Sequence, residues 1–369
     1  MSSAVGVRRM PRRAWAAPAA AWALLLADQA GFSTHEGPAL TLAALLLGAA
    51  IFAAVHHAEV VAERVGQPFG AVLLAFAVTA IEASLIVSLM LSAAAAAEDA
   101  VPPSEAARDT VFAAMMLVLN GVVGLCLLIG GLRHREQGFQ ARGAAAALGV
   151  LGTLATLALI LPDYTVAAPG PYYAPAQLVF VATTSLLLYG LFIFVQTVRH
   201  RADFLDAGLA PAEAPRPSAR IATASGALLV ASLAAVILLA DTLSPPLEAA
   251  VREAGLPAAV VGLVIAGVTL LPEGVSALRA AWANRPQTSL NLALGSALSS
   301  IGLTIPLVAA VSLWLGLPLA LGLDDEHLVL LALTLFVSTL TLATGRTTVL
   351  QGGVHLVIAG AFLTITLMP

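Results

Sequence analysis

Two glutamates stand inside long apolar stretches of the sequence, where acidic side chains are rare. Glu82 follows about twelve apolar or small residues that begin at Gly70 and precedes a similar stretch, and Glu273 has comparable surroundings. If these stretches cross a membrane, each ionised carboxylate there costs roughly 2.5 kcal/mol or more. Ionisable residues kept at such depth usually have a function, so both glutamates are candidates for binding a cation or a proton.

A threonine accompanies each of these glutamates on the same side of its predicted helix. Thr79 lies one helical turn before Glu82, and Thr269 lies four residues before Glu273. Side chains three or four residues apart share a helix face. Each hydroxyl could therefore join its carboxylate as a ligand, or it could bond to the backbone of its own helix.

Small polar residues also appear in the apolar stretch that follows each glutamate. They could supply neutral ligands, while small and hydroxyl side chains equally favour close helix packing. Asn120 is the strongest of them, because it is an isolated amide in the middle of its stretch. The predicted cation- and proton-binding set is Glu82, Glu273, Thr79, Thr269, Asn120, Ser299 and Ser300, with both glutamates as metal ligands.

No arginine or lysine lies in the middle of an apolar stretch, where these two glutamates stand, so the sequence provides no basic residue to form an ion pair with either of them. A metal cation could satisfy both carboxylates at once, and hard cations prefer oxygen ligands. His355, alone on an apolar stretch near the end of the chain, is more typical of a hydrogen-bonded packing residue than of a ligand, and we leave it outside the set.

The composition identifies the elements that must position these residues. The 369 residues are 60% hydrophobic and only 10% charged, with a mean hydropathy of +0.95, which predicts an all-α polytopic membrane protein. Apolar runs long enough to cross a bilayer recur along the whole length, and we predict about 11 transmembrane helices. They lie near 14–33, 38–62, 70–95, 110–132, 143–162, 175–198, 220–241, 256–280, 289–316, 327–344 and 348–368.

The distribution of charge sets a predicted orientation for these helices. If the basic N-terminus is cytoplasmic, eleven crossings place every arginine except Arg108 and Arg252 on the cytoplasmic side, as expected for basic residues of membrane proteins. The net charge of −4 and the scattered arginines give no sign of a nucleic-acid partner. The single cysteine, Cys126, excludes an intrachain disulfide.

An internal repeat divides the chain. In the first copy, a Gly-x-Pro sequence is followed by VTAIE, which ends in Glu82. In the second copy, another Gly-x-Pro sequence is followed by VTLLPE, which ends in Glu273. Five helices per copy is an odd number, so the copies cross in opposite directions, as in many secondary transporters that bind substrate near the midplane. We predict an N-terminal tail with the first helix at 1–36, a first repeat at 37–198, a cytoplasmic linker at 199–219 and a second repeat at 220–369.

Four segments together resemble the cation/proton exchangers of the calcium/cation antiporter superfamily, particularly the bacterial ChaA-type branch. They are GQPFGAVLLAFAVTAIEASLI, the run NGVVGLCLLIGG, VGLVIAGVTLLPEGVSALRAA and LNLALGSALSSIGLTIP. The resemblance implies one extra helix plus two inverted five-helix repeats, with Glu82 and Glu273 binding calcium that leaves as protons enter. Many relatives have a Gly-Asn-Ala-Thr-Glu type of motif, whereas this chain has VTAIE and VTLLPE, and this leaves the ion selectivity open.

These observations lead to one functional expectation and two rivals. We expect a secondary active transporter, not an enzyme, that exchanges Ca²⁺ for H⁺; a Na⁺ or K⁺/H⁺ antiporter on the same scaffold is the alternative. An ion channel is disfavoured because no selectivity-filter sequence is present, and no HExxH or GxSxG motif suggests an enzyme. Cations and protons are the expected substrates and the lipid bilayer the surroundings, without a resident cofactor. The expected location is a bacterial inner membrane with a cytoplasmic N-terminus, and the oligomeric state is left open.

Overall fold

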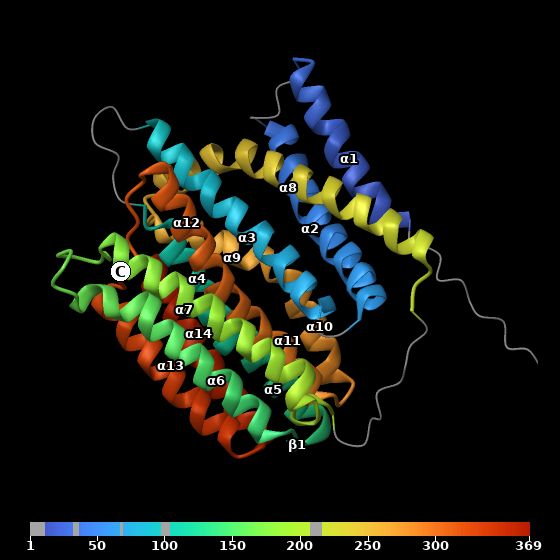
Figure 1. Ribbon diagram of the computed structural model, residues 1–369, viewed down its shortest axis with the longest axis vertical. Helices are drawn as coiled ribbons and strands as arrows, with labels where there is room; N and C mark the ends of the chain where they lie inside the picture. The colour runs from blue at the N-terminus through green and yellow to red at the C-terminus, as the bar shows by residue number, and fades with distance from the viewer. Residues whose placement is uncertain (1–11, 32–36, 67–68, 97–103, 207–215) are drawn as a thin grey trace, which may run out of the picture. The chain divides into compact units, whose positions relative to one another are not determined.

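The structure, a computed structural model, describes residues 12–31, 37–66, 69–96, 104–206 and 216–369. Helices make up almost all of it (Figure 1). The α-helices are α1 Arg12–Gln29, α2 Gly37–Val65, α3 Phe69–Ala96, α4 Ala106–Met116, α5 Val123–His134, α6 Ala141–Ala155, α7 Pro175–Phe194, α8 Ala219–Glu253, α9 Ala259–Thr269, α10 Leu271–Trp282, α11 Pro286–Ser299, α12 Ile305–Leu315, α13 Asp325–Ala343 and α14 Val349–Leu367. The predicted all-α class is confirmed.

Short segments of other geometry interrupt or join these helices. The π-helical segments are η1 Leu117–Val122, η2 Thr156–Ile160, η4 Val195–Arg199 and η6 Ser300–Thr304. The 3₁₀ segments are η3 Leu161–Tyr164 and η5 Arg201–Phe204, and the two short strands are β1 Gln137–Gly138 and β2 Arg346–Thr347. Segments η1 and η6 interrupt the helices that follow the two glutamates, and π-helical turns within α-helices are frequent at functional sites.

The helices of the described residues agree closely with the predicted spans. Within the part of the chain that the structure describes, nine continuous helices are long and apolar enough to cross a membrane, and α9 with α10 forms a further candidate span that bends by 53°. The bend falls directly before Pro272, whose missing amide donor disturbs a helix at this point. Helix α1 occupies the first predicted span, although it is not among the helices that meet these criteria.

Two predicted boundaries differ from the structure. Helix α8 was expected to end near residue 241, but it continues through Pro245 and Pro246 to Glu253. Arg108 and Asp109 were expected in a loop, but they lie in the first turn of α4 and both are buried. Parts of the predicted N-terminal tail and of the 199–219 linker, and Pro68 of the first Gly-x-Pro sequence, lie outside the described residues.

The chain folds into two compact units. The first comprises Met1–Ile81 and Ala212–Leu243, and within it α1 packs on α2. The ring of His57 lies 2.9 Å from the Ala14 carbonyl oxygen, and Trp22 Nε1 donates to Ala231 O at 3.0 Å. This unit contains α1, α2, the start of α3 as far as Ile81, and α8 as far as Leu243. Compactness and the predicted repeat boundaries therefore divide the chain differently.

The second unit comprises Glu82–Pro211 and Ser244–Pro369 and contains both glutamates. Its interior pairs helices from different halves of the sequence: α4 packs on α9, α5 on α14 and α10, α11 on α6, and α12 on α7. Met115, Met116, Leu119, Leu151 and Leu154 are among its fully buried side chains. Helix α10, which carries Glu273, and segment η6, which follows α11, are therefore held by contacts made across the two predicted repeats.

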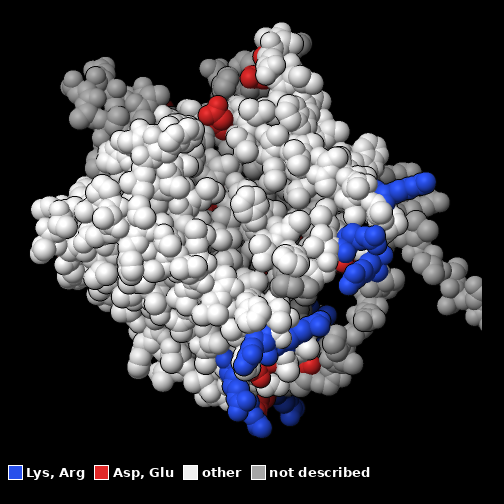
Figure 2. Space-filling view, in the orientation of Figure 1, with Lys and Arg blue, Asp and Glu red and all other residues white. Residues whose placement is uncertain are grey.

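Loops predicted to lie on the same side of the membrane meet one another in this unit. At one end, β1 pairs with β2, Gln137 bonds to Asn284 and Arg346 pairs with Glu136. At the other end, Ser104 bridges to Leu319, and Leu321 N donates to Pro171 O. Blue arginine atoms gather in Figure 2 near the end where Figure 1 places β1. This separation of loop sets is what alternating crossings require.

A shared backbone feature precedes both glutamate-bearing helices. Gly66 and Gly255 have φ angles of +79° and +67°, the left-handed region that favours glycine. Gly66 follows α2 and leads into α3, which carries Glu82, and Gly255 follows α8 and leads into α9, which the 53° bend separates from the Glu273 helix α10. The repeated Gly-x-Pro sequence therefore corresponds to a repeated turn among the described residues, for which the glycine supplies the geometry.

Candidate functional site

Glu82 is a buried carboxylate with two hydroxyl donors on one of its oxygens. Its exposed fraction is 3%, and its Oε2 accepts hydrogen bonds from Ser300 Oγ at 2.8 Å and Thr304 Oγ1 at 3.0 Å. Its other oxygen, Oε1, is buried and has no hydrogen-bond partner among the described residues. A buried carboxylate oxygen without a donor is costly for a protein, so Oε1 is the atom best placed to gain from an arriving cation or proton.

The two hydroxyls that hold Glu82 come from the π-helical segment η6. Ser300 begins this segment and Thr304 ends it, and Pro306 lies in the first turn of α12 directly beyond. Residues four apart lie close to one face of a helix, which lets both hydroxyls reach the same carboxylate oxygen. A glutamate of the first predicted repeat is thus bound by a helix of the second.

Glu273 lies in the first turn of α10, directly after the bend, and is half-buried. Ala277 and Ala281 follow it at four-residue intervals, so all three lie near one face of α10. The two alanines pack against Cys126 of α5, with Val122 of η1 at the edge of this cluster. The face that bears Glu273 is therefore turned toward the η1–α5 helix of the first predicted repeat.

The remaining predicted hydroxyl ligands bond elsewhere or have no partner in the described part of the chain. Thr269 Oγ1 donates to Ile265 O at 3.0 Å, and Ser299 Oγ donates to Ser296 O at 2.9 Å, both within their own helices. Thr79 is buried, and its hydroxyl has no hydrogen-bond partner there. Among the described residues, Ser300 is the predicted neutral ligand that donates a hydrogen bond to Glu82.

Asn120 is completely buried and belongs to a polar network that joins η1 to α13 and α14. Its Nδ2 donates to Thr334 Oγ1 at 3.0 Å, and its Oδ1 lies 3.2 Å from His355 Nδ1. His355 Nε2 lies 3.1 Å from Thr341 Oγ1. His355 is hydrogen-bonded, as expected for a packing residue, but its partner Asn120 could not be predicted from the sequence.

Thr304 and the partners of Asn120 are the residues that sequence reasoning missed. Thr304 lies four residues after Ser300, and this helical spacing was the available signal. Thr334 and Thr341 lie on α13, far from Asn120 in sequence, and hydroxyl-bearing residues are common throughout that helix. Only the tertiary packing of α13 and α14 against η1 identifies them.

A second group of charged residues lies at the end of the unit that carries Ser104. Arg108 is buried and pairs with Asp109 at 2.8 Å and with Glu105 at 3.0 Å, and its NH1 donates to Gly322 O. Asp324, Glu326 and His327 lie nearby, with potential ligand atoms within 4.8 Å of one another. In the adjoining loop, burial and the nearby negative charge of Asp163 raise the pKa of Tyr173 to about 12.

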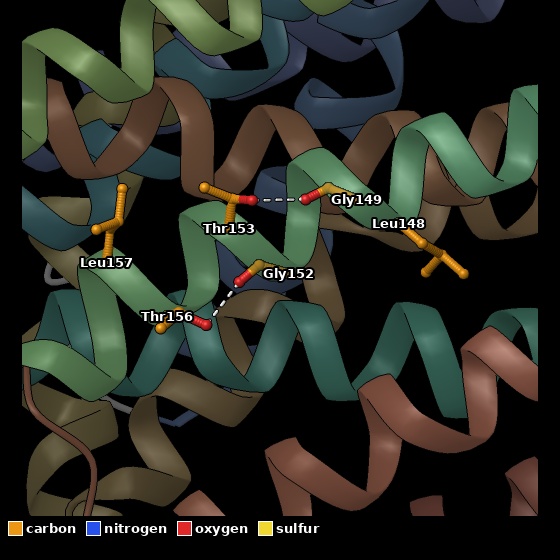
Figure 3. Close-up of a pocket in the computed structure, with 6 residues that line it drawn as sticks. All are labelled: Leu148, Gly149, Gly152, Thr153, Thr156 and Leu157. Carbon is orange, nitrogen blue, oxygen red and sulfur yellow. Dashed lines mark hydrogen bonds between the residues drawn. The ribbon is translucent and has the colours of Figure 1, made fainter.

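A groove on α6 and η2 is not suited to cations. It is lined by Leu148, Gly149, Gly152, Thr153, Thr156 and Leu157 (Figure 3). Thr153 and Thr156 donate their hydroxyl protons to the carbonyls of Gly149 and Gly152, each at 2.8 Å. The lining contains no charged side chain, so the groove offers little to a metal ion, and the cluster around Glu82 is the better cation site.

Comparison with known proteins identifies relatives of the whole chain. The family described as sodium/calcium exchanger protein matches residues 38–198 and 224–368. A "Putative ionic transporter y4hA" of Sinorhizobium fredii is 56% identical over 333 residues, which cover 89% of each chain. A "Sodium-potassium/proton antiporter ChaA" of Escherichia coli is 33% identical over 331 residues and 88% of each chain.

The fold also matches solved structures. One, described as "Crystal Structure of H+/Ca2+ Exchanger CAX", superposes with a TM-score of 0.69 over 96% of this chain and 92% of the other. The sequence identity is 16%, so this likeness concerns the fold. The predicted polytopic helical architecture is therefore one that known exchangers share.

Proposed function

The chain belongs to the sodium/calcium exchanger protein family. On this basis we propose that it exchanges Ca²⁺ and related divalent cations for H⁺ across a membrane. The observation that carries this proposal is the Glu82 carboxylate, which is 3% exposed and has one oxygen held by two hydroxyls and one without a donor. Such a group can be neutralised by a proton or by a cation, and these are the two substrates of an exchanger.

Coupling follows from competition for the same oxygens. A carboxylate that binds a cation must be deprotonated, and a protonated carboxylate no longer attracts a cation. Protons arriving from one side therefore release the cation, and loss of the protons on the other side restores the site. Exposure of the site to the two sides in turn completes the exchange cycle.

Glu273 is proposed as the second carboxylate of this site. Glu82 is bound by η6 of the second repeat, and the Glu273 face of α10 is turned toward η1 and α5 of the first. This reciprocal arrangement supports a shared site between the repeats. Two carboxylates together would balance the charge of a divalent cation, whereas one would leave it half compensated.

The predicted neutral ligands remain part of the proposal. Ser300 contributes through its bond to Glu82. Thr269 and Ser299 use their hydroxyl protons for backbone bonds, but a hydroxyl oxygen keeps lone pairs that can coordinate a cation. Thr79 is retained for its place one turn before Glu82, and Asn120 for the second lone pair of its amide oxygen.

Exchange of Na⁺ or K⁺ for H⁺ is the second candidate function. The Escherichia coli relative, 33% identical to this chain, carries the name sodium-potassium/proton antiporter. The hydroxyls of Ser300 and Thr304 are neutral oxygen ligands that a monovalent cation also accepts. The two candidates use the same scaffold and are separated by which cation moves.

Membership of the exchanger family supports the assignment of the protein as a transporter and not an enzyme. The apolar helices support its assignment as an integral membrane protein. We place it in the bacterial plasma membrane with its N-terminus in the cytoplasm. Support for this orientation comes from the arginines, nearly all of which fall in one set of alternate loops of the sequence.

Transport by the purified protein in vesicles tests the proposal. We would impose a pH gradient and record Ca²⁺, Na⁺ and K⁺ flux for the wild type, Glu82→Gln and Glu273→Gln. Glu253→Gln is the matched control, because Glu253 is an exposed acidic residue at the end of α8. We expect gradient-dependent Ca²⁺ flux that both site variants abolish and the control keeps.

Other outcomes separate the candidates. Flux of Na⁺ or K⁺ without Ca²⁺ would establish the second candidate function. Full coupled flux in either site variant would show that the proposed two-carboxylate site is wrong. Flux that ignores the pH gradient would contradict proton exchange itself.

A further inference from the structure

His355 joins three elements through a hydrogen-bonded network in the interior of the second unit. Its Nδ1 meets Asn120 of η1, and its Nε2 meets Thr341 of α13, while its own helix is α14. Asn120 continues the network to Thr334, whose hydroxyl lies 3.4 Å from Met116 Sδ. His355, Asn120 and Thr334 have exposed fractions of 0%.

The hydrogen-bonding groups around the His355 ring determine which of its nitrogens carries the proton. As placed, the Asn120 oxygen only accepts, so His355 Nδ1 carries the proton of this bond. In a neutral ring, Nε2 then accepts from the Thr341 hydroxyl. A charged ring would be costly here, because no described carboxylate forms an ion pair with it in this apolar interior. One neutral tautomer satisfies both neighbours.

The surrounding packing holds the ring in place. Helix α14 approaches α5 so closely that a Cβ added at Gly124 would lie 3.1 Å from His355 Cβ. A Cβ at Gly352 would lie 2.4 Å from Leu128 N. Small residues commonly permit such close helix contacts within membranes. The ring therefore has little freedom to move, and it can act as a fixed reference for the Asn120 amide.

Segment η1 connects this network to the helix that bears Glu273. Asn120 lies within η1, and η1 contacts α10. Val122, two residues beyond Asn120, would lie 3.5 Å from a Cβ added at Gly274, the neighbour of Glu273. A change in the orientation of Asn120 or in the shape of η1 would therefore alter the contact between Val122 and the first turn of α10, which carries Glu273.

We propose that His355 is a positioning residue of the exchange site, which through its Nδ1–Asn120 hydrogen bond fixes the amide and the π-helical segment packed against the Glu273 helix. His355 does not touch the cation in this arrangement. It sets the geometry that cation binding requires, so its loss weakens binding more than it slows turnover. This inference rests on the proposed function, because it deepens the description of that same site.

Variants at position 355 isolate the hydrogen bond to Asn120. His355→Asn places an amide nitrogen near the position of Nδ1, and His355→Gln carries the same group one bond farther along the side chain. His355→Leu removes hydrogen bonding while keeping an apolar side chain. Exchange would be measured in vesicles as flux against cation concentration, normalised to folded protein, to give the KM and maximal rate of each variant.

We expect His355→Leu and His355→Gln to raise the cation KM about tenfold, which corresponds to the free energy of one buried hydrogen bond, the one to Asn120. Their maximal rates should stay within about twofold of the wild type, and His355→Asn should restore the KM. Thr341→Val should raise the KM by a smaller factor, since it removes only the outer contact of the ring. Thr339→Val is its matched control, because Thr339 is exposed on the same helix and bonds to Leu335 O.

The outcomes distinguish the roles. An unchanged KM in His355→Leu, with the yield of folded protein reduced, would show a structural role and overturn the proposal. Equal KM values in His355→Asn and His355→Leu would also overturn it, because the bond to Asn120 would then be irrelevant. Failure of the proposed function is separate: it appears as exchange that survives Glu273→Gln, whatever the variants at 355 do.

Discussion

The two oxygens of the Glu82 carboxylate have different surroundings. Oε2 accepts from Ser300 and Thr304, whereas Oε1 is buried without a donor among the described residues. Hydrogen bonds donated to a carboxylate stabilise its ionised form. The two hydroxyls therefore stabilise the deprotonated Glu82 carboxylate in an apolar interior, and Oε1 is the oxygen that we propose for binding the substrate.

Removing these hydroxyls is expected to shift the pH dependence of exchange. In Ser300→Ala and Thr304→Val, the ionised carboxylate loses a hydrogen bond worth about 1.5–3 kcal/mol, so protons compete with the cation at higher pH. The pH at which cation uptake is half-maximal should rise by about one unit or more. Uptake measured across a pH series checks this, with Thr184→Val as a control, because the half-buried Thr184 hydroxyl bonds to the Phe180 carbonyl of its own helix.

The contradicting result would be a pH profile that stays in place, or moves to lower pH, in both variants. A fall in maximal uptake without any shift would indicate that the hydroxyls shape the pathway and have no role in the competition between cation and proton.

Single residues show both the power and the limit of sequence reasoning. The sequence proposed Glu82 and Ser300 as ligands, because an acid at mid-span and a polar helix face are visible in one dimension, and the structure joins the two by a hydrogen bond. It could not decide which hydroxyls would meet the carboxylate. Thr269 and Ser299 bond to carbonyls within their own helices, a choice that depends on what each side chain faces after packing.

Helices α5 and α14 are brought together by glycines. The Cβ positions of Gly131 and Gly352 would fall 2.6 Å from Val349 N and 2.4 Å from Leu128 N, which are backbone atoms that cannot move aside easily. Gly353, the next residue of α14, has nothing within 4 Å of its Cβ position. The adjacent glycines of α14 thus have opposite surroundings.

We expect Gly352→Ala to destabilise the protein and Gly353→Ala to leave its stability unchanged or slightly higher. The first change forces α14 away from α5 at a cost of about 1–3 kcal/mol, and the second removes a flexible residue from a helix. Thermal unfolding in detergent would show a lower Tm for Gly352→Ala only. Equal Tm values for the two variants would contradict the close contact between these helices.

Helix positions were largely predictable, whereas their irregularities were not. Apolar run length locates a span, and the bend between α9 and α10 lies beside Pro272, a residue type that the sequence shows directly. The π-helical segments η1 and η6 leave no clear pattern in the sequence, because they depend on packing against neighbouring helices. The end of α8 was predicted near residue 241, too early, because its backbone continues through Pro245 and Pro246 to Glu253.

At the scale of the whole chain, the two sets of loops predict opposite accessibility across the membrane. In a Cys126→Ala background, a cysteine introduced by Arg346→Cys should react with a membrane-impermeant maleimide from the cytoplasmic side only, and one introduced by Glu326→Cys from the outer side only. Both positions are exposed, and Cys126 itself is 2% exposed. Labelling of intact cells and of inverted vesicles makes the measurement.

If Arg346→Cys were labelled only from the outer side and Glu326→Cys only from the cytoplasmic side, the proposed orientation would be wrong, but the helices would still cross the membrane in alternating directions. Labelling of both positions from the same side would contradict the alternating crossings themselves. The sequence could predict this arrangement because arginine placement is a one-dimensional signal, but the separate units were not foreseen, since compactness depends on contacts that the order of helices does not reveal.

The contacts that satisfy the buried polar groups join distant parts of the chain, and this constrains how the protein is made. Glu82 and Ser300 are 218 residues apart, and Asn120 and Thr334 are 214 apart. At a synthesis rate of about 5–20 residues per second, the ribosome needs roughly 10–40 s to reach the partner of Glu82 after making the glutamate itself. During that interval the first half of the chain holds its acidic side chain without its permanent hydroxyl partners, so membrane insertion must tolerate an unfinished site.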